Sequence, residues 1–323
     1  MITRRHALAA LSLPALLPAI ARANPWPVRP VRLIVPFAAG GSVDAGARLL
    51  AEPLGQRIGQ SVVVENRAGA GGMVGAEATV RAPADGHTLL WGSSAVVSIA
   101  AALRRNLTYN PLTDLAPLSV VMRAWHGLLA SPSLPATTLP EAIALARRQP
   151  GEFNIASGGT GSATHLLAER LKLAAGIDLV HVPYRGSGQI YPDLAGGRVH
   201  FAFESLPVAL AQARAGMARL LGVTAPARTP LAPDVPTLVE NGVTGFVTSA
   251  WFGVLVGSGT PAETRHAIEA AVVAASADAE FRTRSTSAGF EVVASTAGEF
   301  ATLIQGEVAA WTEVGERTGI RLD

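Results

Sequence analysis

The 323-residue sequence contains no cysteine and a single lysine, Lys172. The absence of cysteine excludes disulfides, thiolate metal sites, cysteine nucleophiles and a lipoprotein anchor. The near absence of lysine argues against P-loop NTPases, kinases and Schiff-base enzymes, which all need a placed lysine. Apolar residues make up 49% of the chain, so it can fold around one large core or two medium ones.

The net charge of the chain is also small. The formal charge is +2, but three of the 26 basic residues and none of the 24 acidic ones lie in the first 23 positions. The rest of the chain therefore carries a formal charge of −1. Such a near-neutral body has no electrostatic footprint for nucleic acid, and we expect no nucleic-acid partner.

The first 23 residues have the pattern of a secretory signal peptide. Two arginines precede an apolar run over residues 7–20, and Ala21-Arg22-Ala23 has the small-x-small form of a cleavage site. The run is interrupted by two prolines and is shorter than the about 20 residues of a membrane span. The paired arginines also resemble a twin-arginine signal, so both the Sec and the twin-arginine routes stay open. We expect a mature chain that begins near Asn24 and works in the periplasm.

Short apolar strands, Gly-rich turns and helices alternate along the rest of the chain. Residues 31–35 form a strand that leads through a Gly-rich turn into an amphipathic helix. This order recurs, which predicts βαβ units and a largely parallel sheet in an α/β fold. The expected strands are 31–35, 61–65, 88–91, 127–130, 153–156, 179–182, 199–203 and 249–256, and the expected helices are 45–58, 73–81, 139–148, 163–175, 261–275 and 297–318.

Proline-rich stretches separate two series of such units. We expect two α/β lobes, with the second inserted into the first. Residues 24–123 and 248–323 form the first lobe, and residues 124–247 form the second. The chain crosses between lobes twice, near Arg123 and Val247, and two crossings make a hinge that closes on a ligand.

Three Gly-rich turns lead from a strand into a helix, at residues 37–42, 66–72 and 157–162. Such a turn directs free backbone N–H groups, with the positive end of the helix dipole, at an anion. The alternative is a plain tight connection, but two turns in separate lobes favour an anion site. The spacings do not fit nucleotide binding, because no glycine precedes lysine and the third Rossmann glycine is missing.

Catalytic signals are weak. There is no Gly-x-Ser-x-Gly or His-Glu-x-x-His motif, and the seven histidines lack metal-ligand spacing. Asp44 either caps its helix or shapes a ligand site. His165, in the first turn of a helix, faces the cleft or packs on its own loop. Tyr184 and Arg185 lie on a loop at the cleft edge. Glu204 ends a strand, where α/β sheets bind ligands, or is solvated.

Six blocks carry a resemblance to a known family: residues 31–37 with Gly40, Gly41 and Asp44, residues 64–67 with 69–72, residues 156–162 with His165, and residues 182–186, 194–197 and 234–237. Together they resemble the Bug receptors, which are the substrate-binding proteins of tripartite tricarboxylate transporters. The resemblance covers essentially the whole mature chain. It implies a two-lobe periplasmic binding protein of type II, a "Venus flytrap". It also implies a carboxylate ligand held by two loops, partly through water, and delivery to membrane permease subunits.

Three features depart from the family pattern. Glu204 stands where many members have aspartate, and Ser42-Val43 replaces the commoner Pro-Thr before Asp44. The segment 91–98, which contains Ser93, matches a third pocket segment more weakly. These departures concern the identity of the ligand.

We therefore predict a monomeric solute receptor that has no cofactor or metal and catalyses nothing. Backbone amides of residues 37–43 and 157–164 hold the carboxylate. Asp44 and Glu204 would repel a second charge and favour monocarboxylates, amino acids or hydroxy acids over citrate-like ligands. Two alternatives stay open: a sensor subunit for a signalling partner, and an enzyme with Asp44, His165 and Glu204 as acid–base groups. The predicted ligand-binding residues are Phe37, Ala38, Gly40, Gly41, Ser42, Asp44, Ser93, Ser157, Gly159, Thr160, Ser162, Thr164, His165, Tyr184 and Glu204.

Overall fold

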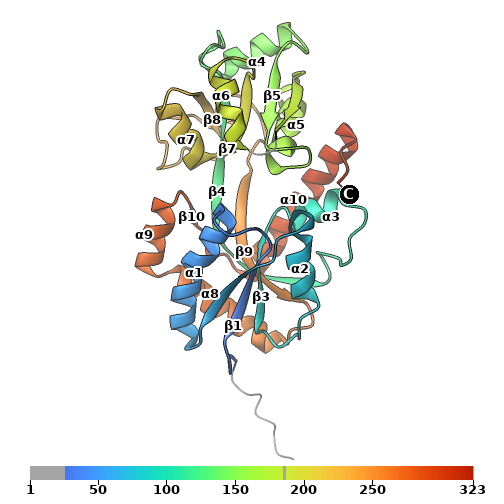
Figure 1. Ribbon diagram of the computed structural model, residues 1–323, viewed down its shortest axis with the longest axis vertical. Coiled ribbons are helices and arrows are strands. Elements are labelled where there is room, and N and C mark those ends of the chain that lie inside the picture. Colours follow the sequence, from blue (N-terminus) through green and yellow to red (C-terminus); the bar gives the residue numbers. More distant parts are fainter. Residues whose placement is uncertain (1–25, 185–186, 323) are drawn as a thin grey trace, which may run out of the picture.

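The computed structural model describes residues 26–184 and 187–322, which form two lobes one above the other (Figure 1). The predicted signal peptide, residues 1–23, and Arg185 lie outside the described residues. None of the helices formed by the described residues has both the length and the apolar character that a membrane span requires.

The first lobe is a mixed sheet with helices on both faces (Figure 1). Its strands lie in the order β2-β1-β3-β9-β4, and β10 also pairs with β4. The strands are β1 (Val31–Val35), β2 (Val62–Asn66), β3 (Thr88–Ser93), the first part of β4 (Leu115–Ala130), β9 (Ser249–Gly257) and β10 (Glu291–Val292). The helices are α1 (Ser42–Ile58), η1 (Ala70–Gly72), α2 (Met73–Val80), α3 (Ser98–Leu103), α8 (Ala262–Ser276), α9 (Ala279–Ser287) and α10 (Ala297–Thr318).

The second lobe is a smaller sheet that shares β4 with the first. Its strands follow the order β4-β7-β5-β6, and β8 also pairs with β4. The further strands are β5 (Asn154–Ser157), β6 (Val180–Pro183), β7 (Phe201–Ser205) and β8 (Arg219–Val223). The helices are α4 (Leu139–Arg148), α5 (Ala163–Ala175), η2 (Ser187–Gln189), α6 (Ile190–Ala195) and α7 (Leu206–Arg214).

Strand β4 runs through both lobes. It pairs with β9 from Leu115 to Trp125 and with β7 from His126 to Ala130. Both pairings are antiparallel, as is the pairing of β3 with β9, whereas β1 pairs parallel with β2 and β3. The prediction of a largely parallel sheet is therefore wrong for β4 and β9. These two strands carry the chain out of the first lobe and back into it, so they run in opposite directions side by side.

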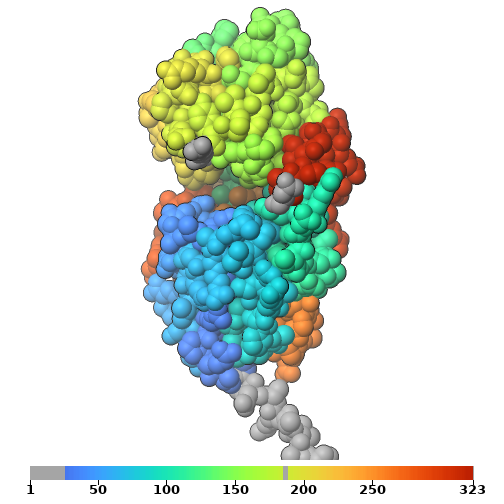
Figure 2. All heavy atoms as spheres, turned by 45° about the vertical axis from the view of Figure 1, so that its right-hand side comes forward, coloured from blue at the N-terminus to red at the C-terminus, as the bar shows by residue number. Residues whose placement is uncertain are grey.

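Each lobe has its own apolar core. In the first lobe, α1 buries Ala47, Leu50 and Leu54, which lie on one helical face because they are three and four residues apart. The core of the second lobe extends further, because α3 and the end of α10 also pack into it through Leu103 and Trp311. Figure 2 shows the C-terminal part, in red, lying against the upper lobe beside the waist of the molecule. Helix α10 thus contacts both lobes.

Candidate functional site

The connection between β1 and α1, residues 36–41, contains all but the last residue of the first predicted Gly-rich turn and leaves the start of that helix uncapped. Its last residue, Gly41, is the N-cap of α1, has φ −85° and ψ 173°, and no side chain caps the helix. Gly40 has φ 88°, a left-handed conformation that glycine adopts without strain. Ala38, Gly40, Gly41 and Ser42 are exposed. Among the described residues, the first N–H groups of α1 therefore have no side-chain acceptor, which is the arrangement that binds anions.

The carboxylate of Asp44 holds this turn in place. It is 3% exposed and accepts hydrogen bonds from the Gly40 amide, Arg48 Nε and Asn66 Nδ2, each at 2.9 Å. Asn66 Nδ2 also donates to the Phe37 carbonyl oxygen at 3.0 Å. The Arg48 hydrogen bond, helped by those from Gly40 and Asn66, lowers the pKa of Asp44 from 3.8 to about 2. Asp44 therefore stabilises the conformation of the turn. The sequence alone did not predict that Arg48 and Asn66 bind its carboxylate.

The second predicted ligand turn, residues 157–162, satisfies most of its own amides. Ser162 caps α5 by accepting from the His165 amide at 3.3 Å, and Thr160 is exposed at the tip of the turn. Three glycine amides donate to side chains of the turn or of the start of α5: Gly158 N to Thr164 Oγ1 at 3.0 Å, Gly159 N to Ser157 Oγ at 3.2 Å, and Gly161 N to His165 Nδ1 at 3.0 Å. Fewer amides are therefore left for a ligand here than at α1.

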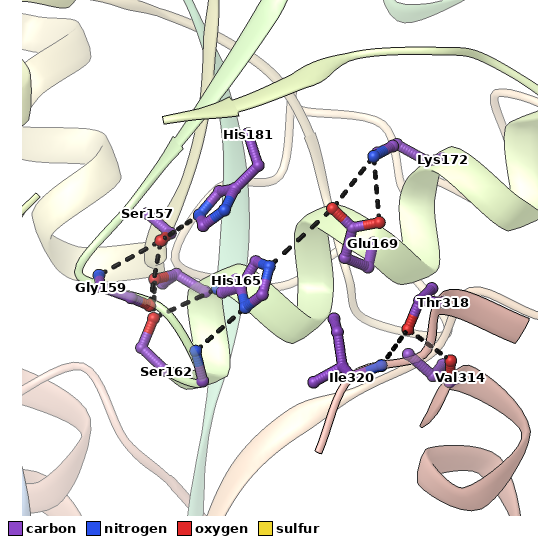
Figure 3. Close-up of polar contacts among 12 residues, drawn as sticks. Ser157, Gly159, Ser162, His165, Glu169, Lys172, His181, Val314, Thr318 and Ile320 are labelled. Atoms are coloured by element: carbon purple, nitrogen blue, oxygen red, sulfur yellow. Dashed lines mark hydrogen bonds and ion pairs between the residues drawn. The ribbon is translucent and has the colours of Figure 1, made fainter. Parts of the chain in front are cut away.

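Two stacked histidines support this second turn (Figure 3). The ring centroids of His165 and His181 are 3.9 Å apart. His181 Nε2 lies 2.7 Å from Ser157 Oγ, and His165 Nε2 lies 3.9 Å from Glu169 Oε1. Ser157 is 0% exposed, and its hydroxyl also contacts the backbone of Gly159 on both its N–H and its carbonyl. The contact between Ser157 and His181 therefore stabilises the turn. The Ser157 hydroxyl is buried and is not accessible to a substrate.

The histidine pair predicts a pH dependence of stability. Burial lowers the pKa of His181 from 6.5 to about 4, with a further contribution from His165, whose own pKa burial also lowers. The unfolded chain then binds more protons, so this stabilisation is complete above pH 6.5 and is lost as the pH falls towards 4. We expect the free energy of unfolding, from urea titrations, to fall across this window. His181→Asn should reduce the slope, while the exposed His266→Asn on α8 should keep it. Equal slopes in wild type and His181→Asn would contradict the assignment.

A pocket of about 180 Å³ lies between the two lobes. It is formed by the start of α1, the end of β3, the start of β9, the hinge part of β4, and helices α3, α5 and α10. A larger groove, of about 750 Å³, lies along α1 and β2 on the first lobe alone and contains none of the predicted residues. Three predicted residues, Phe37, Ser42 and Ser93, line the inter-lobe pocket. The other lining residues are Val43, Ser94, Ala95, Ile99, His126, Ala163, Leu167, Thr248, Ser249, Ala250, Trp251, Phe252 and Trp311.

Three polar side chains that line this pocket are buried without a partner among the described residues. They are Ser93, His126 and Trp311, which are 7%, 8% and 5% exposed. Ser93 Oγ, His126 Nδ1 and Trp311 Nε1 make no hydrogen bond within the described chain. An unsatisfied buried polar group costs about 1–3 kcal/mol, so a bound molecule that reaches these atoms would be stabilised. Burial also lowers the pKa of His126 to about 4, so its ring is neutral at pH 7.

Sequence reasoning missed His126 and Trp311. His126 lies on β4 and Trp311 on α10, so the two meet only through the tertiary fold. Neither sits beside a Gly-rich turn or within a motif. No local signal in the sequence distinguishes them from core residues.

Tyr184 and Glu204 are held by partners in the second lobe. Tyr184 donates to Asp193 at 2.6 Å, and burial together with this bond raises the pKa of Tyr184 to about 12. Glu204 accepts from the Tyr191 hydroxyl at 2.7 Å and from the backbone amide that follows it at 2.8 Å. Both carboxylate oxygens are therefore engaged.

The register of β4 and β7 sets the direction of Glu204. Glu204 pairs with Gly127, the neighbour of His126. Because successive residues of a strand point to opposite faces, Glu204 faces away from the side on which His126 lines the pocket. Its predicted contact with the ligand stays a prediction that this register does not favour.

Metal ligation has no candidate in the part of the chain that the structure describes. There, no three or more histidine, aspartate or glutamate side chains are grouped to hold a metal ion. The chemistry of the inter-lobe pocket is instead that of amide and hydroxyl donors in an apolar surround.

Comparison with known proteins places this geometry in context. A family model described as "Tripartite tricarboxylate transporter family receptor" matches residues 46–320. Protein BugT of Bordetella pertussis is 38% identical over 310 residues, which are 93% of this chain and 92% of BugT. Among solved structures, R. palustris Rpa4515 with adipate has a TM-score of 0.78 at 34% identity, covering 92% of this chain and 99% of that one. MatC from Rhodopseudomonas palustris with bound malate has a TM-score of 0.74 at 32% identity, covering 90% and 99%. The likeness confirms the predicted α/β fold of the periplasmic binding-protein class.

Proposed function

The chain belongs to the tripartite tricarboxylate transporter receptor family, and on that premise we propose that it binds a small carboxylate in the pocket between its lobes. The resemblance predicted from the sequence blocks is thereby confirmed. Relatives with 34% and 32% identity are solved with adipate and with malate, which are both carboxylates.

The observation that carries the proposal is the uncapped start of α1 at the wall of the pocket. Ser42 and Val43, the first two residues of α1, line the pocket, and no side chain caps the helix. A carboxylate at this position accepts from the free amides and interacts with the positive end of the helix dipole. The neighbouring Ser93 side chain lines the same pocket, and its buried hydroxyl makes no hydrogen bond within the described chain.

The family is one of receptors, and the chain is a solute receptor rather than an enzyme. The enzyme alternative required acid–base groups at Asp44, His165 and Glu204. Asp44 is occupied by three donors, His165 is stacked on His181, and Glu204 is bound by Tyr191. This arrangement gives none of the three a free path to a substrate in the pocket.

The transport role extends the proposal beyond the ligand. The receptor works in the periplasm, and it delivers its ligand to the membrane permease subunits of a tripartite transporter. Residues 1–23 direct export by the Sec or the twin-arginine route. We propose that the lobes are residues 24–123 with 248–323 and residues 124–247, and that they close about two crossings, one on β4 near Arg123 and one before β9 near Val247.

Binding without turnover is the expected result for the purified protein. Native mass spectrometry with a panel of mono- and dicarboxylates should give 1:1 complexes whose ligand is recovered with unchanged mass. The matching amides, which lack the negative charge, should bind at least about tenfold more weakly, because hydrogen bonds to a charged group are the stronger ones. Equal binding of acid and amide, or several turnovers per protein molecule, would contradict the proposal.

A further inference from the structure

The inter-lobe pocket is apolar except at a few small donors. Its large lining side chains are Phe37, Ile99, Leu167, Trp251, Phe252 and Trp311. Its polar side chains are serines, one threonine, the neutral His126 and the indole N–H groups. Among the described residues that line it, none is lysine, arginine, aspartate or glutamate. The part of a ligand that lies in this pocket therefore contacts mainly apolar side chains.

The pocket compensates one carboxylate and has nothing for a second. The start of α1 supplies amides and a partial positive charge at one place. A second carboxylate deeper in the pocket would lose its water without meeting a cation among the residues that line the pocket, and the burial of an unpaired charge is strongly unfavourable.

A carboxylate of the protein lies behind the apolar wall. Glu307 of α10 accepts from Trp251 Nε1 at 2.8 Å and from Ser94 Oγ at 3.4 Å, and both Trp251 and Ser94 line the pocket. Burial raises the pKa of Glu307, which agrees with an environment that disfavours negative charge. A second ligand carboxylate in this direction would meet that environment and, when Glu307 is ionised, a like charge.

The size of the pocket sets the size of the ligand body. Its volume is about 180 Å³. In another protein an engineered cavity of about 150 Å³, lined by apolar side chains, binds benzene. One six-membered ring or a branched chain of similar bulk fits this space.

We propose that the ligand is a monocarboxylate with a compact apolar body, aromatic or branched, whose carboxylate lies at the start of α1 and whose body lies between Leu167 and the two tryptophans, Trp251 and Trp311. This inference rests on the proposed function and narrows it. On this proposal the residues that line the pocket select the ligand. Glu204, for which the sequence predicted that role, faces away from His126.

Calorimetric titration of the purified full chain with benzoate, malate, adipate and citrate tests the proposal. Benzoate should bind about tenfold or more tightly than the other three, because its ring buries apolar area and no second charge is desolvated. Tighter binding of malate, adipate or citrate would overturn the inference and leave the proposed carboxylate receptor standing. If none of the four acids binds, the proposed function fails and the inference fails with it.

A cavity-filling variant gives an independent readout. Ala163 is an exposed residue of α5 that lines the pocket, so Ala163→Leu adds bulk inside the pocket while disturbing little of the core. Benzoate affinity should fall about tenfold, while acetate, which lacks the body, should lose less than about twofold. Ala174→Leu, at another exposed position of α5, is the matched control and should leave both affinities unchanged. An unchanged benzoate affinity in Ala163→Leu would place the ring elsewhere and overturn the inference.

Discussion

Replacement of Gly41 by valine is expected to lower carboxylate affinity at least about a hundredfold while the fold survives. Two charge-assisted hydrogen bonds, at about 1.5–3 kcal/mol each, account for a loss of this size. In the absence of ligand a Cβ at Gly41 meets nothing within 4 Å, and its extended backbone suits a β-branched residue. The added side chain would then occupy the space that the ligand needs to reach the α1 amides. Calorimetric titration combined with thermal unfolding measures both effects.

The control for this variant is a glycine that does not line the pocket. Gly298 on α10 also has open space where a Cβ would lie, and its φ is not left-handed. Gly298→Val should keep wild-type affinity, and both variants should lose no more than about 1 kcal/mol of stability. Gly159 is a poorer choice, because its φ is 134° and a Cβ would lie 3.3 Å from the Tyr184 carbonyl oxygen. Undiminished affinity in Gly41→Val would remove the α1 turn from the site.

Asp44→Asn is expected to lower the free energy of unfolding by about 2 kcal/mol and to weaken binding about tenfold. The carboxylate accepts from Gly40, Arg48 and Asn66, and an amide loses the charge in all three bonds. The expected loss of stability is moderate, because the Arg48 side chain is half-exposed and water can solvate its charge in the variant. Urea titrations give the stability, and calorimetry with the tightest-binding carboxylate gives the affinity.

The pH dependence separates Asp44 from the histidines. The pKa of Asp44 is lowered from 3.8 to about 2, so its stabilisation is complete above pH 3.8 and is lost as the pH falls towards 2. Asp44→Asn should therefore remove part of the acid slope below pH 4. Asp85 also accepts a backbone hydrogen bond and pairs with an arginine, but it is exposed and far from the pocket. Asp85→Asn should leave binding unchanged, and an equal loss of affinity in both variants would contradict a specific role for Asp44.

The helices that the sequence predicted most accurately carry their end signals locally. The bounds of α4 and α10 agree with the prediction, and both begin with a capping box, at Thr138 with Glu141 and at Thr296 with Glu299. Helix α5 ends at Gly176, whose φ of 61° is typical of a helix C-terminus. In each case a few neighbouring residues decide where the helix begins or ends.

Elements that depend on distant partners were missed. The first half of β4 contains Pro117, which suggests a break, yet this half pairs with β9 more than 100 positions away. Helix α9 has a polar sequence and is fixed by Phe281 packing into the first lobe. Propensity and periodicity report local preference, and tertiary pairing overrides it in both places.

In the candidate site, too, residues with a local sequence signal could be predicted, and residues brought in by tertiary packing could not. The turn before α1 could be predicted because it follows a strand at the edge where α/β sheets bind ligands. Ser93, the last residue of β3, was predicted only from the family resemblance of segment 91–98. His126 and Trp311 come from the hinge strand and the C-terminal helix, and only the packing of α10 against the second lobe brings them to the pocket. The predicted role of the second turn was based on its glycines, its hydroxyl side chains and its resemblance to a ligand loop, but the fold satisfies three of its glycine amides with side chains of the turn and of the start of α5.

A crystal structure of the protein with its tightest-binding carboxylate tests the central claim most directly. We expect a carboxylate oxygen about 2.7–3.2 Å from the backbone nitrogen of Ser42 or Val43, with the rest of the ligand in the pocket beside Ser93 and His126. A carboxylate bound away from the start of α1, whether on an arginine of the surface or in the groove along β2, would contradict it.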